Sequence, residues 1–291
     1  MSDLLNRIEE ITGPNGLIAG EDVHQRPGDW MGLTKCNALA VARPASTREL
    51  SKIMKICHEL GQPVVAAGGL TGLVHGTDAS REEIVVSLER MTDIEVIDSI
   101  GRTVTVQAGA PMQKVQEAAQ AEGLMFAVDL GARGSATIGG NIATNAGGNQ
   151  VIRYGMMREQ VLGIEAVLAD GTIVSSMNTL LKNNTGYDLK QLFIGSEGTL
   201  GLVTRAVLRL VTQPKSEQTA LVAVSNFSAL TNFFQHVSDN LGGLLTAFEV
   251  MWQEHYQLIA VESGRHTPPL EPGAAYYVVV EANGNDPYRD N

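Results

Sequence analysis

The chain has little cysteine, few basic residues and no long apolar run. Cys36 and Cys57 are its only cysteines among 291 residues, which excludes a disulfide framework, and their spacing is not that of a metal site. No stretch approaches the roughly 20 apolar residues that span a bilayer. Lys and Arg number 21 against 32 Asp and Glu, so the net charge is −11. This balance argues against nucleic acid or an anionic membrane as a main partner, because both attract basic surfaces.

The first twelve residues lack the order of a signal peptide. Met1 to Thr12 form an acidic amphipathic helix pattern, whereas a secretory signal has a basic segment followed by an apolar one. Together with the absence of a membrane-spanning pattern, this leads us to expect a soluble cytoplasmic protein.

Length and a hydrophobic fraction of 44% predict about two domains with packed cores. Within residues 36–100 we expect one small α+β unit. Its helix begins at a capping box of Ser46 and Glu49 and ends at Gly61, with Cys57 on the buried face. The other predicted elements of this part are strands at 63–66 and 84–88 and a hairpin of 94–98 with 103–107.

Residues 101–213 form the second predicted unit, and a boundary follows at 212–216. Pro111 is placed to open a helix, which Gly123 ends, and Asp170-Gly171 predicts a hairpin. The predicted strands are 161–169, 172–175 and 202–211. Beyond the boundary, strands at 220–225, 244–252 and 276–282 alternate with helices at 230–241 and up to 262. The predicted class is α+β.

Three glycine-rich segments are the main signal for function. The first, Ala66 to Leu73, offers amide donors from Gly68 through Gly72 with little side-chain obstruction, and Thr71 adds a hydroxyl. Such a loop can form an anion nest for a pyrophosphate. It is neither a Walker loop nor a Rossmann fingerprint. The alternative interpretation is a plain glycine-rich turn between two strands.

The second and third segments differ in chemistry. Gly139 to Gly148 contains Asn141 and Asn145, whose amides both donate and accept, as flavin and adenine edges require. A helix start with small packed residues is the alternative. In the third segment, 195–201, there are two interpretations of the Glu197 carboxylate. It either accepts hydrogen bonds from ribose hydroxyls or caps local loop amides.

These segments occur in order with Arg153-Tyr154-Gly155 and with Lys182 to Leu189 (Lys-Asn-Asn-Thr-Gly-Tyr-Asp-Leu). The combination, over about residues 35–210, resembles the FAD-binding domain of the vanillyl-alcohol-oxidase/PCMH flavoprotein superfamily. Within it, the chain is most similar to the branch of FAD-linked D-lactate, glycolate-oxidase-subunit and D-2-hydroxyglutarate dehydrogenases.

The resemblance implies a PCMH-type FAD-binding domain at 1–213, with FAD between subdomains 36–100 and 101–213. The start of a ferredoxin-like cap domain follows at 214–291. The pyrophosphate would lie on the first loop, and the second loop would follow the ribityl chain and flavin. The residues that it assigns to FAD are Ala67, Gly68, Gly69, Leu70, Thr71, Gly72, Leu73, Gly134, Thr137, Gly139, Gly140, Asn141, Thr144, Asn145, Gly147, Gly148, Glu197, Gly198, Gly201 and Val203.

Two positions depart from the pattern of the family. Covalent relatives often carry histidine directly after the glycine pair, where this chain has Leu70, so we expect non-covalent FAD. His75 stands where this branch usually has glycine. It is either a solvated loop histidine or a flavin contact.

The C-terminal histidine motifs of the family, which bind the substrate, a divalent metal and the hydroxyl proton, do not occur in this sequence. The histidines outside the first loop are isolated, and only His255 falls in the predicted cap as a candidate; they are His24, His58, His236, His255 and His266. We therefore assign no catalytic residue and no metal ligand.

The resemblance implies an FAD-dependent dehydrogenase of D-2-hydroxy acids. A base would take the hydroxyl proton while the α-hydrogen leaves as hydride to flavin N5. Electrons would pass to a quinone, a cytochrome or an electron-transfer flavoprotein, and a homodimer is compatible with the sequence. Two alternatives stay open: a short FAD-binding subunit or pseudoenzyme, and a UDP-sugar reductase of the same fold.

Overall fold

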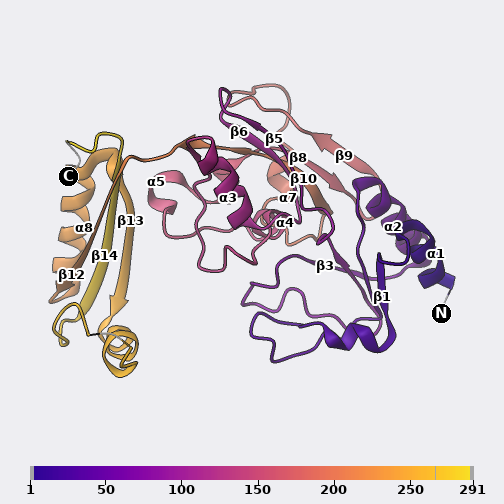
Figure 1. Ribbon diagram of the computed structural model, residues 1–291, viewed down its shortest axis with the longest axis horizontal. Coiled ribbons are helices and arrows are strands. Elements are labelled where there is room, and N and C mark those ends of the chain that lie inside the picture. Colours follow the sequence, from indigo (N-terminus) through magenta and orange to yellow (C-terminus); the bar gives the residue numbers. More distant parts are fainter. Residues whose placement is uncertain (1–2, 266, 289–291) are drawn as a thin grey trace. The chain divides into compact units, whose positions relative to one another are not determined.

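The computed structural model describes residues 3–265 and 267–288 (Figure 1). Contacts divide the chain into two compact units. Unit 1 comprises Met1–Ala127, Gly131–Ala146 and Met156–Thr212, and unit 2 comprises Val128–Leu130, Gly147–Gly155 and Gln213–Asn291. Two short pieces from the middle of the sequence thus belong to the C-terminal unit.

Unit 1 contains a four-stranded sheet in the order β1-β2-β4-β3. Its strands are β1 (Leu17–Ala19), β2 (Ala40–Ala42), β3 (Val64–Ala67) and β4 (Ile84–Ser87). β4 pairs in parallel with both β2 and β3, and β1 is antiparallel to β2. Helices α1 (Asp3–Thr12) and α2 (Thr47–Leu60) pack on one face, and the 3-10 helix η1 (Gly20–Gln25) packs on the other.

The capping residues of α2 are those that the sequence predicts. Ser46 Oγ accepts a hydrogen bond from the Glu49 amide at 3.2 Å, and Gly61 ends the helix with a φ of 64°. The Glu49 carboxylate, however, accepts from the amide of Ala45 at 2.8 Å and not from that of Ser46. The side chain reaches one residue further back, so it fixes the chain before the cap as well as the first turn.

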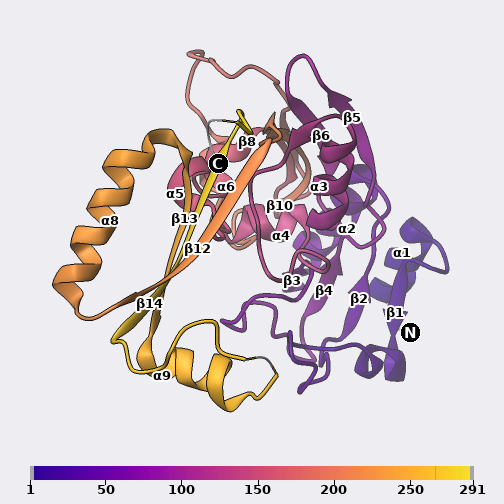
Figure 2. The same ribbon diagram turned by 60° about the vertical axis from the view of Figure 1, so that its left-hand side comes forward.

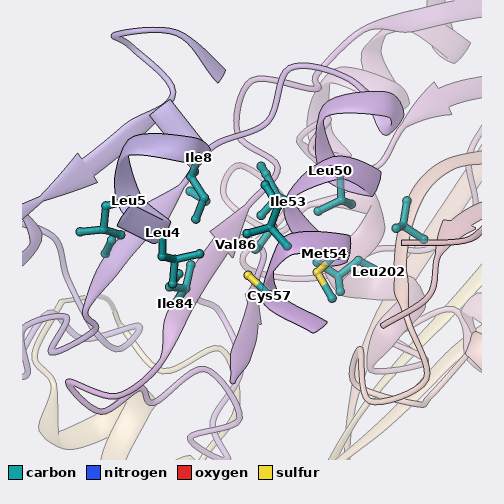
Figure 3. Packing of buried hydrophobic residues seen from close by; sticks show 14 residues of the cluster. Leu4, Leu5, Ile8, Leu50, Ile53, Met54, Cys57, Ile84, Val86 and Leu202 are labelled. Carbon is teal, nitrogen blue, oxygen red and sulfur yellow. The ribbon is translucent and has the colours of Figure 1, made fainter. Parts of the chain in front are cut away.

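Helix α2 supplies the centre of a hydrophobic core in unit 1. Figure 3 shows Ile53 and Cys57 of α2 beside Ile84 and Val86 of β4, with Ile8 of α1 in the same cluster. Leu202 and Val167, from the second sheet of unit 1, belong to this cluster too. One face of the helix therefore packs against residues of both sheets while Arg48, Lys52 and Lys55 stay exposed, which is why its apolar positions are so regular in the sequence.

The second sheet of unit 1 has the order β5-β6-β10-β8-β9, and all its pairs are antiparallel. Its strands are β5 (Ile94–Asp98), β6 (Thr103–Gln107), β8 (Val161–Val167), β9 (Ile173–Ser176) and β10 (Leu202–Arg209). The predicted hairpin β5–β6 is present, but it lies in this sheet and not with the first hundred residues. The hairpin lies in this sheet because β6 pairs with β10, a strand about a hundred residues further along the chain.

Short elements connect the sheets of unit 1. Pro111 precedes α3 (Met112–Ala121) as predicted, and Gly123 follows it with a φ of 70°. The others are the two-stranded pair β7 (Leu124–Met125) with β11 (Val211–Thr212), and the helices α4 (Ile138–Ala143), α6 (Met157–Gln160) and α7 (Lys190–Phe193).

Unit 2 is built on a three-stranded sheet in the order β12-β14-β13. β12 (Ser216–Val224) and β13 (Leu245–Trp252) are each antiparallel to the central strand β14 (Tyr276–Gly284). Helix α8 (Phe227–Leu241) links β12 to β13 and packs on one face of the sheet. The remaining elements are α5 (Val151–Tyr154), α9 (Gln253–Tyr256), the 3-10 helix η2 (Gly242–Leu244) and the π-helix η3 (Gln257–Glu262). The α+β class and the predicted strand–helix alternation are confirmed.

Burial of Cys57 generates a prediction about its reactivity. Burial raises the pKa of its thiol to about 11, so at pH 8 about one molecule in a thousand carries the thiolate that reacts with alkylating agents. We expect iodoacetamide to label the half-buried Cys36 first, and Cys57 only after denaturation. A Cys36→Ser variant isolates the second thiol, and rapid labelling of this native variant, followed by mass spectrometry, would contradict the buried placement of α2.

Candidate functional site

The first two glycine segments meet in unit 1. The first loop continues from β3, and a Cβ added to Gly68 would lie 2.8 Å from Thr137 Oγ1 and 3.3 Å from Gly140 Cα. At Gly69 the added atom would lie 1.9 Å from the Ser135 carbonyl oxygen. No side chain fits at either position, so the sequence allows here a backbone-to-backbone approach that other residues would block.

The third segment, residues 195–201, is hydrogen-bonded to helix α4. The amides of Gly195 and Glu197 donate to the carbonyl oxygens of Ile142 and Ala143 at 3.0 and 2.8 Å. A Cβ on Gly198 would lie 3.0 Å from that of Ala66 in β3. The three segments therefore converge on the end of β3 and on α4, elements that lie close to β10 (Figure 2).

Backbone conformation sets this region apart. Leu70, His75, Asn145 and Glu197 have φ values of 54°, 59°, 48° and 52°, which lie in the left-handed region. Among the described non-glycine residues, only Arg102 shares this property. Such conformations cost about 1–3 kcal/mol each and tend to occur at ligand sites. Three of the five, Leu70, Asn145 and Glu197, occur in the segments singled out from the sequence, and His75 follows the first segment by two residues.

Helix α4 explains the chemistry of the second segment. Thr137 caps the helix by accepting from the Gly140 amide at 3.2 Å, and Thr144 donates back to the Gly140 carbonyl at 2.9 Å. A Cβ on Gly139 would lie 2.8 Å from that of Ala108, so this glycine packs directly after β6. The helix start with small packed residues, kept above as an alternative, is thus present at the same place as the convergent loops.

The two asparagine side chains do not present their amides as the sequence suggested. Asn141 is 4% exposed and donates from Nδ2 to Met112 Sδ at 3.3 Å, so its side chain is aimed into the core. Asn145 Oδ1 accepts from the Arg158 amide at 2.9 Å. Both side chains are therefore engaged within unit 1.

The other predicted FAD residues are divided between the two units. Val203 is buried in β10, which begins directly after Gly201, a residue with a φ of 153°. Gly147 and Gly148 belong to unit 2, where a Cβ on Gly148 would lie 1.9 Å from the Asp129 carbonyl oxygen. The remaining members all lie in unit 1 and are Ala67, Thr71, Gly72, Leu73 and Gly134.

Sequence reasoning passed over the hairpin of residues 26–37. The Cys36 amide donates to the Arg26 carbonyl at 2.9 Å, and Asp29 caps the tip by accepting from the Met31, Leu33 and Thr34 amides. The Thr34 hydroxyl, and after it these amides, lower the pKa of Asp29 to about 2. The turn residues Pro27-Gly28-Asp29 are the local sequence signal that indicates this hairpin.

A cavity of about 220 Å³ lies between this hairpin and the first glycine loop. Arg26 and Ser87 are at its wall, with Gly68 and Leu70 on the side of the loop. Arg26 and Arg43 both pair with Glu89. Burial alone would raise the pKa of Glu89, but the hydrogen bonds and charges of the two arginines outweigh it and lower that pKa. The charge of Arg26 at the cavity wall is thus compensated by Glu89.

The described histidines form no catalytic group. His75 is exposed and lies 3.3 Å from Asp78, and His24 Nδ1 lies 2.9 Å from the Cys36 carbonyl oxygen. His255 is exposed on α9, and His266 lies outside the described residues. Within the described part of the chain, no cluster of three His, Cys, Asp or Glu side chains could hold a metal.

Two family comparisons agree with this geometry. Residues 38–176 match the family described as FAD binding domain. Residues 213–291 match the family described as FAD linked oxidases, C-terminal domain. The chain contains an FAD-binding domain and an FAD-linked oxidase C-terminal domain. FAD is accordingly its cofactor, and the glycine-rich first loop, which packs against residues 135–140, has the composition that suits backbone binding of a large phosphorylated ligand.

Curated relatives come from plants, animals and bacteria. The chain is 39% identical to the probable mitochondrial D-2-hydroxyglutarate dehydrogenase of Oryza sativa subsp. indica, over 98% of this chain and 51% of that protein. It is 36% identical to the mitochondrial D-2-hydroxyglutarate dehydrogenase of Bos taurus (99% and 53%). It is 40% identical to the D-2-hydroxyglutarate dehydrogenase of Xanthomonas citri pv. viticola (91% and 55%). The chain spans about half the length of these relatives.

Solved structures support the fold. An alkyldihydroxyacetonephosphate synthase matches with a TM-score of 0.80 at 18% identity, over 97% of this chain and 56% of that one. A p-cresol methylhydroxylase matches with a TM-score of 0.74 at 14% identity, over 97% and 60%. The PCMH-type flavoprotein fold expected from the sequence is confirmed.

The expected cytoplasmic location is wrong. The relatives from rice, cattle and Schizosaccharomyces pombe are named as mitochondrial enzymes. Net charge and hydropathy restrict the partners of a folded domain but do not report its compartment, so they were insufficient for that conclusion. Among the described residues, no helix has the length and apolarity needed to cross a bilayer.

The convergence of the loops can be tested with two glycines of unit 1. Gly69→Ala would place a methyl group 1.9 Å from a carbonyl oxygen, whereas Gly131→Ala, outside the proposed FAD contacts, would meet nothing within 4 Å. We expect Gly69→Ala to raise the Kd of FAD at least about tenfold, a change of about 1.4 kcal/mol, and Gly131→Ala to change it little. Titration of apoprotein by flavin fluorescence measures both constants. Equal values for the two variants would refute the close approach at Gly69.

Proposed function

We propose that this chain binds FAD non-covalently and forms the FAD-holding part of a dehydrogenase of D-2-hydroxy acids. The observation that supports this most is the convergence of three glycine segments on β3 and α4, with no room for side chains at Gly68 and Gly69. The names of the relatives, D-2-hydroxyglutarate dehydrogenase and putative D-lactate dehydrogenase, supply the substrate class.

In this proposal residues 1–213 form the FAD-binding domain and 214–291 form part of the cap. The amides of Gly68 to Leu73 and the Thr71 hydroxyl would hold the pyrophosphate. Glu197, held near the loop by its bond to Ala143, would accept from ribose hydroxyls or loop amides. A Cβ on Gly76 would lie 2.9 Å from Glu197 Oε2, so this carboxylate does lie against the far end of the first loop.

Further contacts are proposed at Gly134, Thr137, Gly139 and Gly140, and at the backbones of Asn141, Thr144 and Asn145. The remaining proposed FAD contacts are Gly147, Gly148, Gly198, Gly201 and Val203. Leu70 offers no nucleophile to the flavin, which is the basis for non-covalent binding. When bound, FAD supplies the hydride acceptor. The electron acceptor is proposed to be a quinone, a cytochrome or an electron-transfer flavoprotein, and the assembly a homodimer.

A second candidate is a short FAD-binding subunit that works only with a partner chain. It is favoured by the apolar side chains that unit 2 leaves in solvent. Phe227, Trp252 and Leu258 are 64%, 63% and 59% exposed. Apolar surface of this kind is typical of a face that another polypeptide covers. Size-exclusion chromatography with light scattering separates a chain that associates from one that stays monomeric.

The cofactor proposal predicts a yellow protein that releases its flavin. We expect the purified chain to show the visible absorption of oxidised flavin, and acid precipitation to leave FAD in the supernatant. Flavin that stays with the precipitate would contradict non-covalent binding. A colourless protein that fails to take up added FAD would refute FAD binding by this chain.

The same sample distinguishes the substrate hypotheses. Bleaching of the flavin by D-2-hydroxyglutarate or D-lactate, with the L-enantiomers as the control, would support hydroxy-acid oxidation. Bleaching by NADPH would favour the UDP-sugar reductase. A flavin that none of these compounds reduces would favour the binding subunit or pseudoenzyme.

A further inference from the structure

The hairpin of residues 26–37 brings a lysine to the cavity beside the first glycine loop. Lys35 lines this cavity together with Gly68 and Leu70 of the loop, and all three residues belong to unit 1. The first loop itself, Ala66 to Leu73, contains no lysine or arginine. A cation that neutralises an anion on this loop must therefore come from another segment of the chain.

The loop offers backbone donors that no other protein group occupies. Gly69, Leu70 and Thr71 are half-buried, yet among the described residues their amides donate to no protein acceptor. Leu70 has a φ of 54°, and a left-handed residue within a loop can turn successive amides toward one side. This is the arrangement in which backbone amides bind a phosphate group.

The backbone of the hairpin holds Lys35 at the cavity. The Gly28 amide donates to the Thr34 carbonyl oxygen at 2.9 Å, and the Cys36 amide donates to the Arg26 carbonyl oxygen at 2.9 Å. The residues on both sides of Lys35 are thus hydrogen-bonded across the hairpin. Only the flexible four-carbon stem of Lys35 has to be ordered when its ammonium group meets a ligand.

Among the described residues, Lys35 is the cation at this cavity that has no carboxylate partner. Arg26, also at the wall, pairs with Glu89, and the carboxylate of Asp78 lies 3.3 Å from His75. The Lys35 side chain is exposed and makes no ion pair or hydrogen bond with the described part of the chain. In a protein with a net charge of −11, such a cation beside free loop amides favours an anionic ligand.

We infer that Lys35 contacts the pyrophosphate of FAD. The amides of the first loop hold the phosphate oxygens, and the Lys35 ammonium neutralises their charge from the side of the hairpin. This rests on the proposed FAD binding. A lysine ammonium acts as a point charge, so it adds affinity for the diphosphate without orienting the flavin ring. ADP, which carries the same diphosphate, uses the same contact.

The test compares Lys35→Met, which removes the charge and keeps a long stem, with Lys35→Arg, which keeps the charge. Lys52→Met is the matched control, because Lys52 is an exposed lysine of α2, on the other face of the same sheet, and its loss changes the net charge equally. Flavin fluorescence gives the Kd of FAD for each full-length variant at about 0.05 and about 0.5 M NaCl, concentrations between which screening rises strongly. Displacement of FAD gives the Kd of ADP.

At the lower salt concentration we expect Lys35→Met to raise the Kd of both FAD and ADP about fivefold, and Lys35→Arg to raise it less than about twofold. At the higher concentration the difference between Lys35→Met and the wild type should fall below about twofold, because salt screens exposed charges. Lys52→Met should match the wild type at both concentrations. A structural role of Lys35 alone would weaken binding equally at both concentrations.

A Kd of FAD in Lys35→Met that equals the wild-type value at low salt, or that rises by the same factor at both salt concentrations, would overturn the inference while the proposed function stands. An equal rise in Lys52→Met, or an unchanged Kd of ADP in Lys35→Met, would overturn it too. A wild-type chain that binds no FAD would overturn both proposals. If circular dichroism shows that Lys35→Met does not fold, Lys35→Gln carries the same test.

Discussion

The close approach of two backbones at Gly68 and Gly69 is the constraint on which the rest of unit 1 depends. With a carbonyl oxygen 1.9 Å from where a Cβ would stand, the first loop can only lie against residues 135–140 because it carries no side chains there. This contact brings the end of β3 to α4 and leaves the loop amides as donors. The third segment then completes the arrangement through two backbone hydrogen bonds to α4.

Two sheets of different construction are needed to hold that contact in place. The parallel strands β2, β4 and β3 carry the first loop, while the antiparallel strand β10 runs beside α4. Helix α2 packs between these sheets, and its core includes Ile84 from one and Leu202 from the other. A change in this core would therefore alter the distance between the loops, although none of its side chains reaches the site.

The division of the chain into units does not follow the order of the sequence. Residues 128–130 and 147–155 leave unit 1 and join the sheet formed by β12, β13 and β14. The stretch 38–176 that matches the FAD binding domain is therefore not confined to one compact unit.

Local sequence determined the elements and the kind of ligand. The cap at Ser46, the stop at Gly61, the turn at Asp170-Gly171 and the spacing of apolar residues in α2 act over a few residues, so each could be predicted without a fold. The glycine segments likewise predicted a phosphorylated ligand, because their composition permits close backbone approach.

Tertiary structure decided which strands pair and which groups each side chain contacts. Hairpin β5–β6 joined the second sheet because its partner strand lies a hundred residues away, and the Asn141 amide turned into the core because Met112 is there. The assignment of residues 147–155 to unit 2 also depends on long-range contacts, such as the hydrogen bond from Arg153 to the Asn283 carbonyl oxygen, 130 positions away. Long-range packing of this kind leaves no local periodicity in the sequence.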